Sequence, residues 1–383
     1  MMFLEAIRKR NEGLLHFAQE LHGQGRIPPN TYVIDRTAVV HNAKLVANAA
    51  SKYHISLYAM LKQLAYDPVV SRSIAPFVPK TVAVDWMGAR RTAEIGLKVG
   101  NLGHLVPVPK TEIGPLMSLV DPDVWTVFDT TSATRIADTA RILGRKQDVL
   151  MRIAPDSTSS FPGQEGGVTS DGVVDLAGHC RDIGLGVVGV TSFPCIAWDS
   201  QQQRYVPTIN LDAVVDGANR LAQSGFRVHQ INAPGNTCVA SLPLLAERGV
   251  SHAEPGHAFT GSNPGQAWDV GEEIPAVVYV TEVSTLLPDG TALAFGGGLY
   301  ARGQADIALL DQGKVQIEVP GPEYIDYQFR VYPTSPVEVG DTVIMALRFQ
   351  MFVVRSYRAV VEHDGAHWSL VTLGSPEGRV YHE

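Results

Sequence analysis

Eight short runs of β-branched and apolar residues recur between residues 55 and 253, with longer helical patterns between them. Strands that alternate with helices form parallel sheets, and eight such units favour a closed (β/α)8 barrel, an α/β fold. A doubly wound open sheet stays open as an alternative, because strand order cannot be read from sequence. We expect the strands at residues 55–61, 81–86, 102–108, 124–129, 147–154, 185–193, 227–233 and 250–253, and helices at, for example, 88–99, 131–143, 172–184 and 208–225.

The two ends of the chain follow other patterns. Apolar residues with helical spacing predict an N-terminal helix within residues 1–27. After residue 262 the helical pattern stops, and runs separated by Gly, Pro and Asp predict strands. We therefore expect the barrel at 28–262 and an all-β domain at 263–383, and we expect Tyr32-Val33-Ile34 to pair with that β domain.

Composition excludes several classes of protein. Hydrophobic residues make up 45% of the chain and charged residues 18%, which excludes disorder driven by charge. The net charge of −8 argues against a nucleic-acid surface, and no apolar run is long enough to span a membrane. Three cysteines form neither a disulfide framework nor a zinc spacing, and the first residues lack the order of a signal peptide. We expect a reduced, cytoplasmic protein.

Lys62 directly follows the first predicted strand, and catalytic groups of barrels lie at the carboxyl ends of strands. A lysine with a depressed pKa at a barrel mouth is the usual Schiff-base nucleophile. A lysine that merely extends out of the barrel explains the position equally well. Tyr66 follows four residues later and shares a face with Lys62 if a helix starts there.

Two further turns carry candidate residues. Gly235-Asn236-Thr237 follows the seventh strand and precedes an expected helix, which predicts an anion site or, more simply, an N-cap. Glu254-Pro255-Gly256-His257 follows the eighth strand. Glu254 then lies at the barrel centre, where a carboxylate needs a partner such as a pyridinium nitrogen or Arg152. The first, seventh and eighth strands are neighbours in a closed barrel, so these signals converge.

These residues resemble the fold-type III pyridoxal-phosphate enzymes, the alanine racemase superfamily, over roughly residues 30–300. Lys62-Gln63-Leu64-Ala65-Tyr66 is similar to the family's Lys-Ala-Asn-Ala-Tyr, Asn236-Thr237 to its Asn-Ser phosphate loop, and Glu254-Pro255-Gly256-His257 to the decarboxylases' Glu-Pro-Gly-Arg. Within the superfamily the chain resembles the YhfX-like branch.

The resemblance implies that pyridoxal 5′-phosphate forms an internal aldimine with Lys62. Tyr66, Gly235, Asn236, Thr237, Gly256 and His257 would hold its phosphate, and Glu254 would face its pyridine nitrogen. A glutamate keeps that nitrogen protonated, so the ring withdraws electrons more strongly than in alanine racemase, which has an arginine there. Beyond the resemblance, we assign Arg152 to the substrate, and the planar fork of Arg348 could hold a substrate carboxylate or phosphate unless Arg348 is simply an exposed strand arginine.

Several departures from the family limit this transfer. Ser192 stands where alanine racemase stacks a histidine on the cofactor. The loop at 155–167 is a substrate lid, an anion contact or mobile surface, of which we favour mobile surface. Arg348 and Gln350 replace the metal-binding histidine and cysteine of D-serine dehydratase and D-threonine aldolase, so we predict no zinc of that type.

The second acid, on the cofactor face opposite Lys62, is the largest gap. The family's tyrosine aligns with Phe295, which has no acidic proton, so Tyr300 serves only if the glycine run shifts the register. Cys238 is another candidate, although a buried inert thiol is the simpler interpretation. We expect His104, His179 and His229 to pack or cap.

Three functions compete. The first is an enzyme acting at the α-carbon of an amino acid, a racemase or epimerase with a dehydratase, aldolase or decarboxylase as alternative. By resemblance it would be a homodimer with each site completed by the partner. The second is a non-catalytic carrier of the cofactor, against which the β domain argues. The third is an unrelated barrel enzyme, for which Asp85 and Asp129 alone supply no catalytic cluster.

Overall fold

The computed structural model describes residues 3–156, 159–299, 306–311, 313–321, 323–377 and 380–381. The chain divides into two compact units. We call the first, Ala43–Leu61 with Ser71–Ala258, the barrel unit. The second, which we call the β unit, comprises Met1–Asn42, Lys62–Val70 and Phe259–Glu383. The units differ from the predicted domains, whose boundaries were residues 27 and 262, because the N-terminal segment packs with the C-terminal strands.

The barrel unit contains a parallel sheet whose order is β2-β12-β11-β8-β7-β6-β5-β4-β3. Its two end strands are halves of one strand interrupted at Tyr58, so the sheet returns on itself as an eight-stranded barrel. This confirms the predicted (β/α)8 fold over the open sheet. The strands are β2 (Ser56–Leu57), β3 (Ala59–Met60), β4 (Lys80–Ala83), β5 (Lys98–Leu102), β6 (Val124–Val127), β7 (Asp148–Arg152), β8 (Gly186–Thr191), β11 (Gln230–Asn232) and β12 (His252–Ala253).

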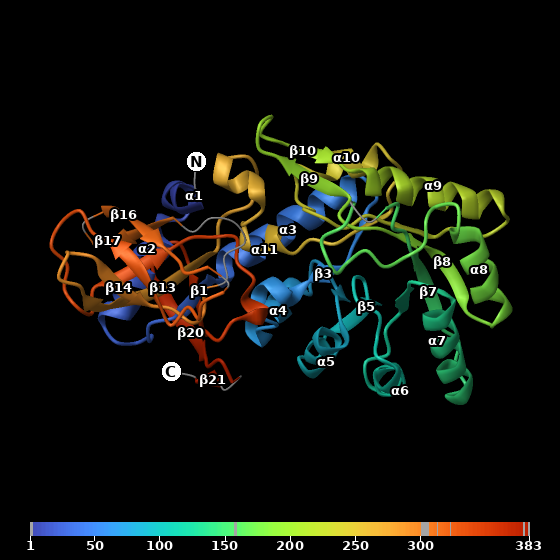
Figure 1. Cartoon of the computed structure of the whole chain (residues 1–383), viewed down its shortest axis with the longest axis horizontal. Helices are drawn as coiled ribbons and strands as arrows, with labels where there is room; N and C mark the ends of the chain where they lie inside the picture. The colour runs from blue at the N-terminus through green and yellow to red at the C-terminus, as the bar shows by residue number, and fades with distance from the viewer. Residues whose placement is uncertain are drawn as a thin grey trace. The chain divides into compact units, whose positions relative to one another are not determined.

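Helices surround these strands, as Figure 1 shows for α5 to α9. Asp85 begins α5 by accepting a hydrogen bond from Gly88 N, and Asp129 begins α7 in a capping box with Ser132. The helices are α3 (Arg36–Lys52), α4 (Pro68–Ile74), α5 (Trp86–Glu94), α6 (Ile113–Leu119), α7 (Thr130–Ile142), α8 (Val173–Asp182), α9 (Ile209–Gln223), α10 (Leu242–Ala246) and α11 (His257–Thr260).

Alternation along the strands separates an outer core from the barrel interior. Val149 and Met151 of β7 belong to the large apolar cluster shared with the helices. Successive side chains of a strand point to opposite faces, so Arg152 points inward. Tyr58, Met60 and Val82 form a small separate cluster of their own. The interior is therefore where any buried polar side chain of the strands must find its partners.

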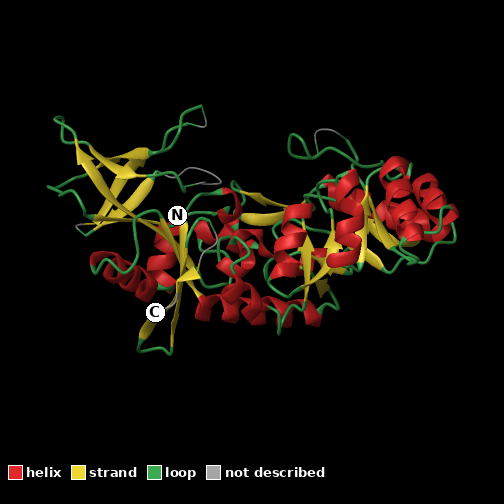
Figure 2. Cartoon of the chain, turned by 90° about the horizontal axis from the view of Figure 1, so that it is seen from below, coloured by secondary structure: helices red, strands yellow, loops and turns green. Residues whose placement is uncertain are grey.

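The β unit is built on a ten-stranded sheet in the order β14-β17-β16-β15-β18-β13-β1-β19-β20-β21. Because β14 also pairs with β13, six antiparallel strands close on themselves. Figure 2 shows strands predominating in this part of the chain. Its strands are β1 (Thr31–Asp35), β13 (Val277–Leu286), β14 (Ala292–Phe295), β15 (Ile307–Leu310), β16 (Gly313–Glu318), β17 (Gln328–Tyr332), β18 (Thr342–Met345), β19 (Tyr357–His363), β20 (Trp368–Gly374) and β21 (Val380–Tyr381).

The N-terminal segment is part of this β unit. Strand β1 pairs antiparallel with β13 and parallel with β19, which confirms the expected pairing of Tyr32-Val33-Ile34. The predicted N-terminal helix is two helices, α1 (Phe3–Arg10) and α2 (Glu12–Gly23). They meet at Asn11, whose Nδ2 donates to Asp35 Oδ2 and Pro275 O, each at 2.9 Å. No helix among the described residues is long and apolar enough to cross a membrane.

Candidate functional site

The carboxylate of Glu254 lies inside the barrel, in the turn that follows β12. Its side chain is 0% exposed. Nδ2 of Asn232, the last residue of β11, lies 2.7 Å from Oε1 of Glu254 and 3.1 Å from Oγ1 of Thr191 at the end of β8. Burying a carboxylate is costly without such partners. The sequence prediction that Glu254 lies inside the barrel and needs partners is met by side chains from neighbouring strand ends.

His104 is the second partner of this carboxylate. It follows β5 after Gly103, whose φ is +82°. The imidazole Nδ1 lies 3.4 Å from Glu254 Oε2, and its side chain is 1% exposed. Its ring also meets Phe193 edge to face, with centroids 5.5 Å apart. Sequence analysis gave His104 only a packing or capping role. The expected strand 102–108 contained His104, whereas β5 ends at Leu102, so the histidine lies just beyond a strand's carboxyl end, where barrels carry their functional groups.

Arg152 ends β7 and is fully buried. Burial lowers the pKa of its guanidinium to about 10, although the nearby Cys195 and Glu254 oppose the shift. Nη2 lies 3.4 Å from the carbonyl oxygens of both Gln164 and Phe193. Within the described parts of the chain, Nε and Nη1 have no hydrogen-bond partner. A buried cation with donors to spare can bind an anionic oxygen.

The described part of the loop at 155–167 is tied to the barrel. Ser159 O accepts a hydrogen bond from Asn210 Nδ2 at 2.7 Å, and Gln164 O faces Arg152. The ring of Phe161 lies 5.9 Å from that of Phe193, the ring that also contacts His104. These contacts join the described part of the loop to the barrel, and its role toward a substrate stays a prediction. Residues 157–158 lie outside the described residues.

The Gly235-Asn236-Thr237 turn is not a helix N-cap. The helix α10 begins five residues after Thr237, at Leu242, so that interpretation is wrong. Gly235 and Asn236 instead have positive φ angles, +126° and +45°. Consecutive backbone groups in a turn of this kind can form a concave anion site. Asn236 Nδ2 donates to Ile196 O at 3.0 Å, and Thr237 Oγ1 accepts from the Glu254 N–H at 3.3 Å, which joins the two predicted turns.

The remaining residues of these loops are buried. His257 begins α11 directly after Gly256 and is 6% exposed. Ser192, at the position where alanine racemase stacks a histidine, is also buried. Its hydroxyl donates to Ile153 O at 2.8 Å and approaches Asn210 Oδ1 at 3.2 Å, which is a structural role.

Lys62 and Tyr66 belong to the β unit. Lys62 lies in a short 3-10 helix, Leu61–Leu64, directly after β3, with its ammonium nitrogen 5.5 Å from the centre of the Phe352 ring. This helix ends before Tyr66, since Ala65 and Tyr66 have φ angles of +50° and +57°. Helical spacing therefore does not bring Lys62 and Tyr66 to one face, which corrects that part of the sequence argument. Tyr66 is buried.

Other predicted residues of the β unit are placed as follows. Arg348 is half-buried and Gln350 buried, both in the segment after β18, so Arg348 is not an exposed strand residue. Phe295 is 39% exposed at the end of β14. Tyr300 lies outside the described residues. Among the described residues no group of three or more His, Cys, Asp or Glu is placed to hold a metal ion.

Cys238 is buried in the barrel unit, with Sγ 3.6 Å from Ser241 Oγ.

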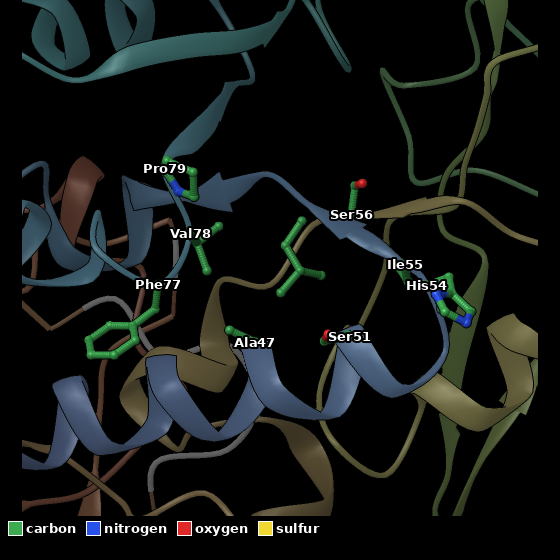
Figure 3. Close-up of a pocket in the computed structure, with 9 residues that line it drawn as sticks. Ala47, Ser51, His54, Ile55, Ser56, Phe77, Val78 and Pro79 are labelled. Carbon is green, nitrogen blue, oxygen red and sulfur yellow. The ribbon is translucent and has the colours of Figure 1, made fainter.

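A surface depression of about 390 Å³, drawn in Figure 3, lies at the amino ends of the barrel strands. Ala47 and Ser51 of α3 line it together with Phe77 and Pro79, beside Ser56 at the amino end of β2. The polar groups around Glu254 lie at the carboxyl ends, so this depression is separate from them.

Comparisons with known proteins agree with this architecture. Residues 34–264 match the family model described as alanine racemase, N-terminal domain, and residues 278–367 match that described as YhfX-like, C-terminal domain. The chain is 35% identical to the uncharacterized protein YhfX of Escherichia coli (strain K12), over 98% of this chain and 96% of that protein.

Similar solved structures show the same fold. D-threonine aldolase from Filomicrobium marinum has a TM-score of 0.69 at 14% identity, covering 90% of this chain and 94% of that one. D-threo-3-hydroxyaspartate dehydratase from Delftia sp. HT23 has a TM-score of 0.68 at 15% identity, covering 90% and 97%. Alanine racemase from Clostridium difficile 630 has 0.65 at 14% identity, covering 91% and 98%.

Proposed function

Because the chain belongs to the YhfX-like branch of the alanine racemase family, we propose that it is a pyridoxal-phosphate-dependent enzyme acting at the α-carbon of an amino acid. The observation that carries the proposal is the buried carboxylate of Glu254 in a barrel whose first strand leads directly to Lys62. We assign the reaction to the racemase or epimerase class. Glu254 supports a lyase as the second candidate, because a protonated, electron-withdrawing ring also suits elimination and retro-aldol cleavage.

The residues of the barrel unit fit this cofactor. Glu254 supplies an acceptor for a pyridinium N–H, and Arg152 supplies buried N–H donors that have no partner among the described residues. Gly235 has φ +126°, and a Cβ there would lie 3.0 Å from Cys195 N, so only glycine suits this turn. A turn with positive φ angles can present N–H groups to a phosphate. The barrel unit thus offers an acceptor for the ring nitrogen of the cofactor and N–H donors for its anionic groups.

We assign the roles accordingly. Lys62 would hold the cofactor covalently, with Tyr66, Gly235, Asn236, Thr237, Gly256 and His257 around its phosphate. When bound, the cofactor supplies the electron-withdrawing ring that makes the α-proton of an amino acid acidic. Lys62 would move that proton on one face, and Tyr300 stays the candidate on the other. Arg152 and Arg348 would orient the substrate through its carboxylate.

We also propose a homodimer. Its support is an exposed apolar cluster in the β unit, made of Tyr324, Ile325 and Tyr327, whose exposed fractions are 70%, 70% and 62%. Exposed apolar side chains gathered in one short segment are typical of contact surfaces.

Covalent attachment to Lys62 is the decisive test. We expect the purified protein to bind pyridoxal phosphate with a visible absorption band, and borohydride reduction with peptide mass mapping to place the adduct on Lys62. The Lys62→Ala variant should lose the adduct, while Lys44→Ala, which changes an exposed lysine of α3, should keep it. A colourless protein, or an adduct on another lysine, would refute the proposal.

Turnover distinguishes an enzyme from a carrier. With a panel of L- and D-amino acids in heavy water, we expect at least one substrate to exchange its α-proton, and Lys62→Ala to abolish the exchange. Inversion of configuration would identify a racemase, and loss of a side-chain fragment or of water or CO2 would identify a lyase. A covalently bound cofactor with no α-proton exchange in any of the amino acids would favour a non-catalytic carrier.

A further inference from the structure

The Glu254 carboxylate has a histidine as its neighbour, and no sequence motif assigns that histidine a role. His104 and Glu254 are separated by 150 positions, yet Nδ1 and Oε2 lie 3.4 Å apart with both side chains essentially inaccessible to solvent. The other oxygen, Oε1, accepts from Asn232 Nδ2 at 2.7 Å. The two oxygens of one carboxylate thus have different partners, which come from different strand ends.

His104 is itself held in place. Phe193 meets its ring edge to face at 82°, and the next aromatic ring, Phe161, lies on Phe193. On the other side of the carboxylate, Asn232 is fixed through Thr191 Oγ1 at 3.1 Å. Asn232 thus hydrogen-bonds one oxygen of the carboxylate, and the His104 imidazole lies within ion-pair distance of the other. Groups on two sides restrict the orientation of the carboxylate, and such preorganisation strengthens its interaction with a bound cationic group.

We propose that His104 is a positioning residue that orients the Glu254 carboxylate toward the ring nitrogen of the bound cofactor. The inference rests on the proposed function for the identity of that cofactor, and it adds a residue that is absent from the matched motifs. His104 would act through Glu254 and need not touch the cofactor or the substrate.

The first test reads the bound cofactor and not turnover. In His104→Phe, which keeps a ring against Phe193, we expect the Kd for pyridoxal phosphate to rise about tenfold, by analogy with the loss of affinity at metal sites when the partner of a metal ligand is removed. The ratio of the cofactor's absorption bands at fixed pH should also move toward that of Glu254→Gln. His104→Asn, which retains a donor, should recover part of both changes.

The β unit offers a matched control. His22 is another buried histidine beside a glutamate, with Nε2 3.1 Å from Glu282 Oε2. We expect His22→Phe to leave the cofactor Kd within twofold and the band ratio unchanged. A wild-type Kd and band ratio in His104→Phe would overturn the positioning role.

The second test does not need the cofactor, so its result is independent of the proposed function. In apoprotein with 15N-labelled histidine, the His104 signals are identified by their loss in His104→Asn. We expect Glu254→Gln to shift the His104 Nδ1 resonance, because its carboxylate partner is lost, and Glu282→Gln to leave it in place. An unchanged His104 signal in Glu254→Gln would show that the pair does not form, whatever the cofactor does.

Discussion

His252 lies in β12 two residues before Glu254. Its partners are an aromatic ring and a hydroxyl, whereas those of His104 include a carboxylate. Its ring stacks on Tyr58 with centroids 5.4 Å apart, and Ser251 Oγ lies 2.9 Å from its Nδ1. Burial, with a smaller effect of the Lys80 charge, lowers the pKa of His252 to about 4. The histidine is therefore neutral in the folded barrel at neutral pH.

This shift predicts a pH-dependent stability. The pKa of His252 is about 4 in the fold against an unfolded value of 6.5, so the unfolded chain takes up the proton first as the pH falls. The contribution of the neutral His252 to the free energy of unfolding is therefore fully present above pH 6.5 and is lost as the pH falls from 6.5 toward 4. Between pH 7 and pH 5 the loss is about 2 kcal/mol.

Urea unfolding at the two pH values measures this loss. The buried Trp125 provides a fluorescence signal within the barrel unit. His252→Phe keeps a ring against Tyr58 but cannot titrate, so its free energy of unfolding should fall less than that of wild type. Equal losses for the two proteins would show that His252 is not responsible.

Strand packing makes a second prediction, at the scale of elements. Gly189 lies in β8 beside β11, and its φ is +154°. A Cβ at this position would lie 1.8 Å from the backbone oxygen of Gln230, which cannot move without disturbing the β8–β11 pairing. We expect Gly189→Ala to lower the free energy of unfolding by about 3 kcal/mol, as overpacking against rigid structure does.

The control lies in a helix of the same unit. Gly178 is inside α8, and a Cβ there would meet nothing within 4 Å. Gly178→Ala should therefore be neutral or stabilise by about 0.5–1 kcal/mol, because alanine is the better helix former. Urea unfolding of both variants decides the matter, and a neutral Gly189→Ala would contradict the close approach of β8 and β11.

At the scale of the whole molecule, the exposed cluster at Tyr324, Ile325 and Tyr327 bears on the proposed homodimer. We expect wild type to be dimeric by light scattering after size exclusion, and Ile325→Asp to weaken the dimer at least tenfold, because a buried charge is costly. Leu119 on α6 is equally exposed, at 71% against 70%, so Leu119→Asp serves as the control. A dimer in Ile325→Asp as strong as in wild type would assign the interface elsewhere.

The elements follow from local patterns. Runs such as Val149 to Met151, bounded by helix ends at glycine, predict strands because the side-chain period of a strand is local. The hairpin of β9 (Ile196–Asp199) and β10 (Arg204–Pro207), by contrast, was not predicted. It is a short insertion after β8 whose few residues carry little periodicity.

The sequence by itself determined the barrel, the strand-rich C-terminal part and the carboxyl-end turns that carry Lys62, Asn236 and Glu254, because strand and turn signals depend on near neighbours. Only the tertiary structure decided which side chains meet. The Glu254 carboxylate meets His104 and Asn232, and Asn232 meets Thr191, although these residues lie at separate strand ends. Closure of the barrel sets the stagger of its strands, and that stagger decides which inward side chains lie at the same height. The sequence predicted that Tyr32-Val33-Ile34 pairs with the β domain, but only the structure shows that this strand lies between β13 and β19, whose paired residues are more than 200 positions away.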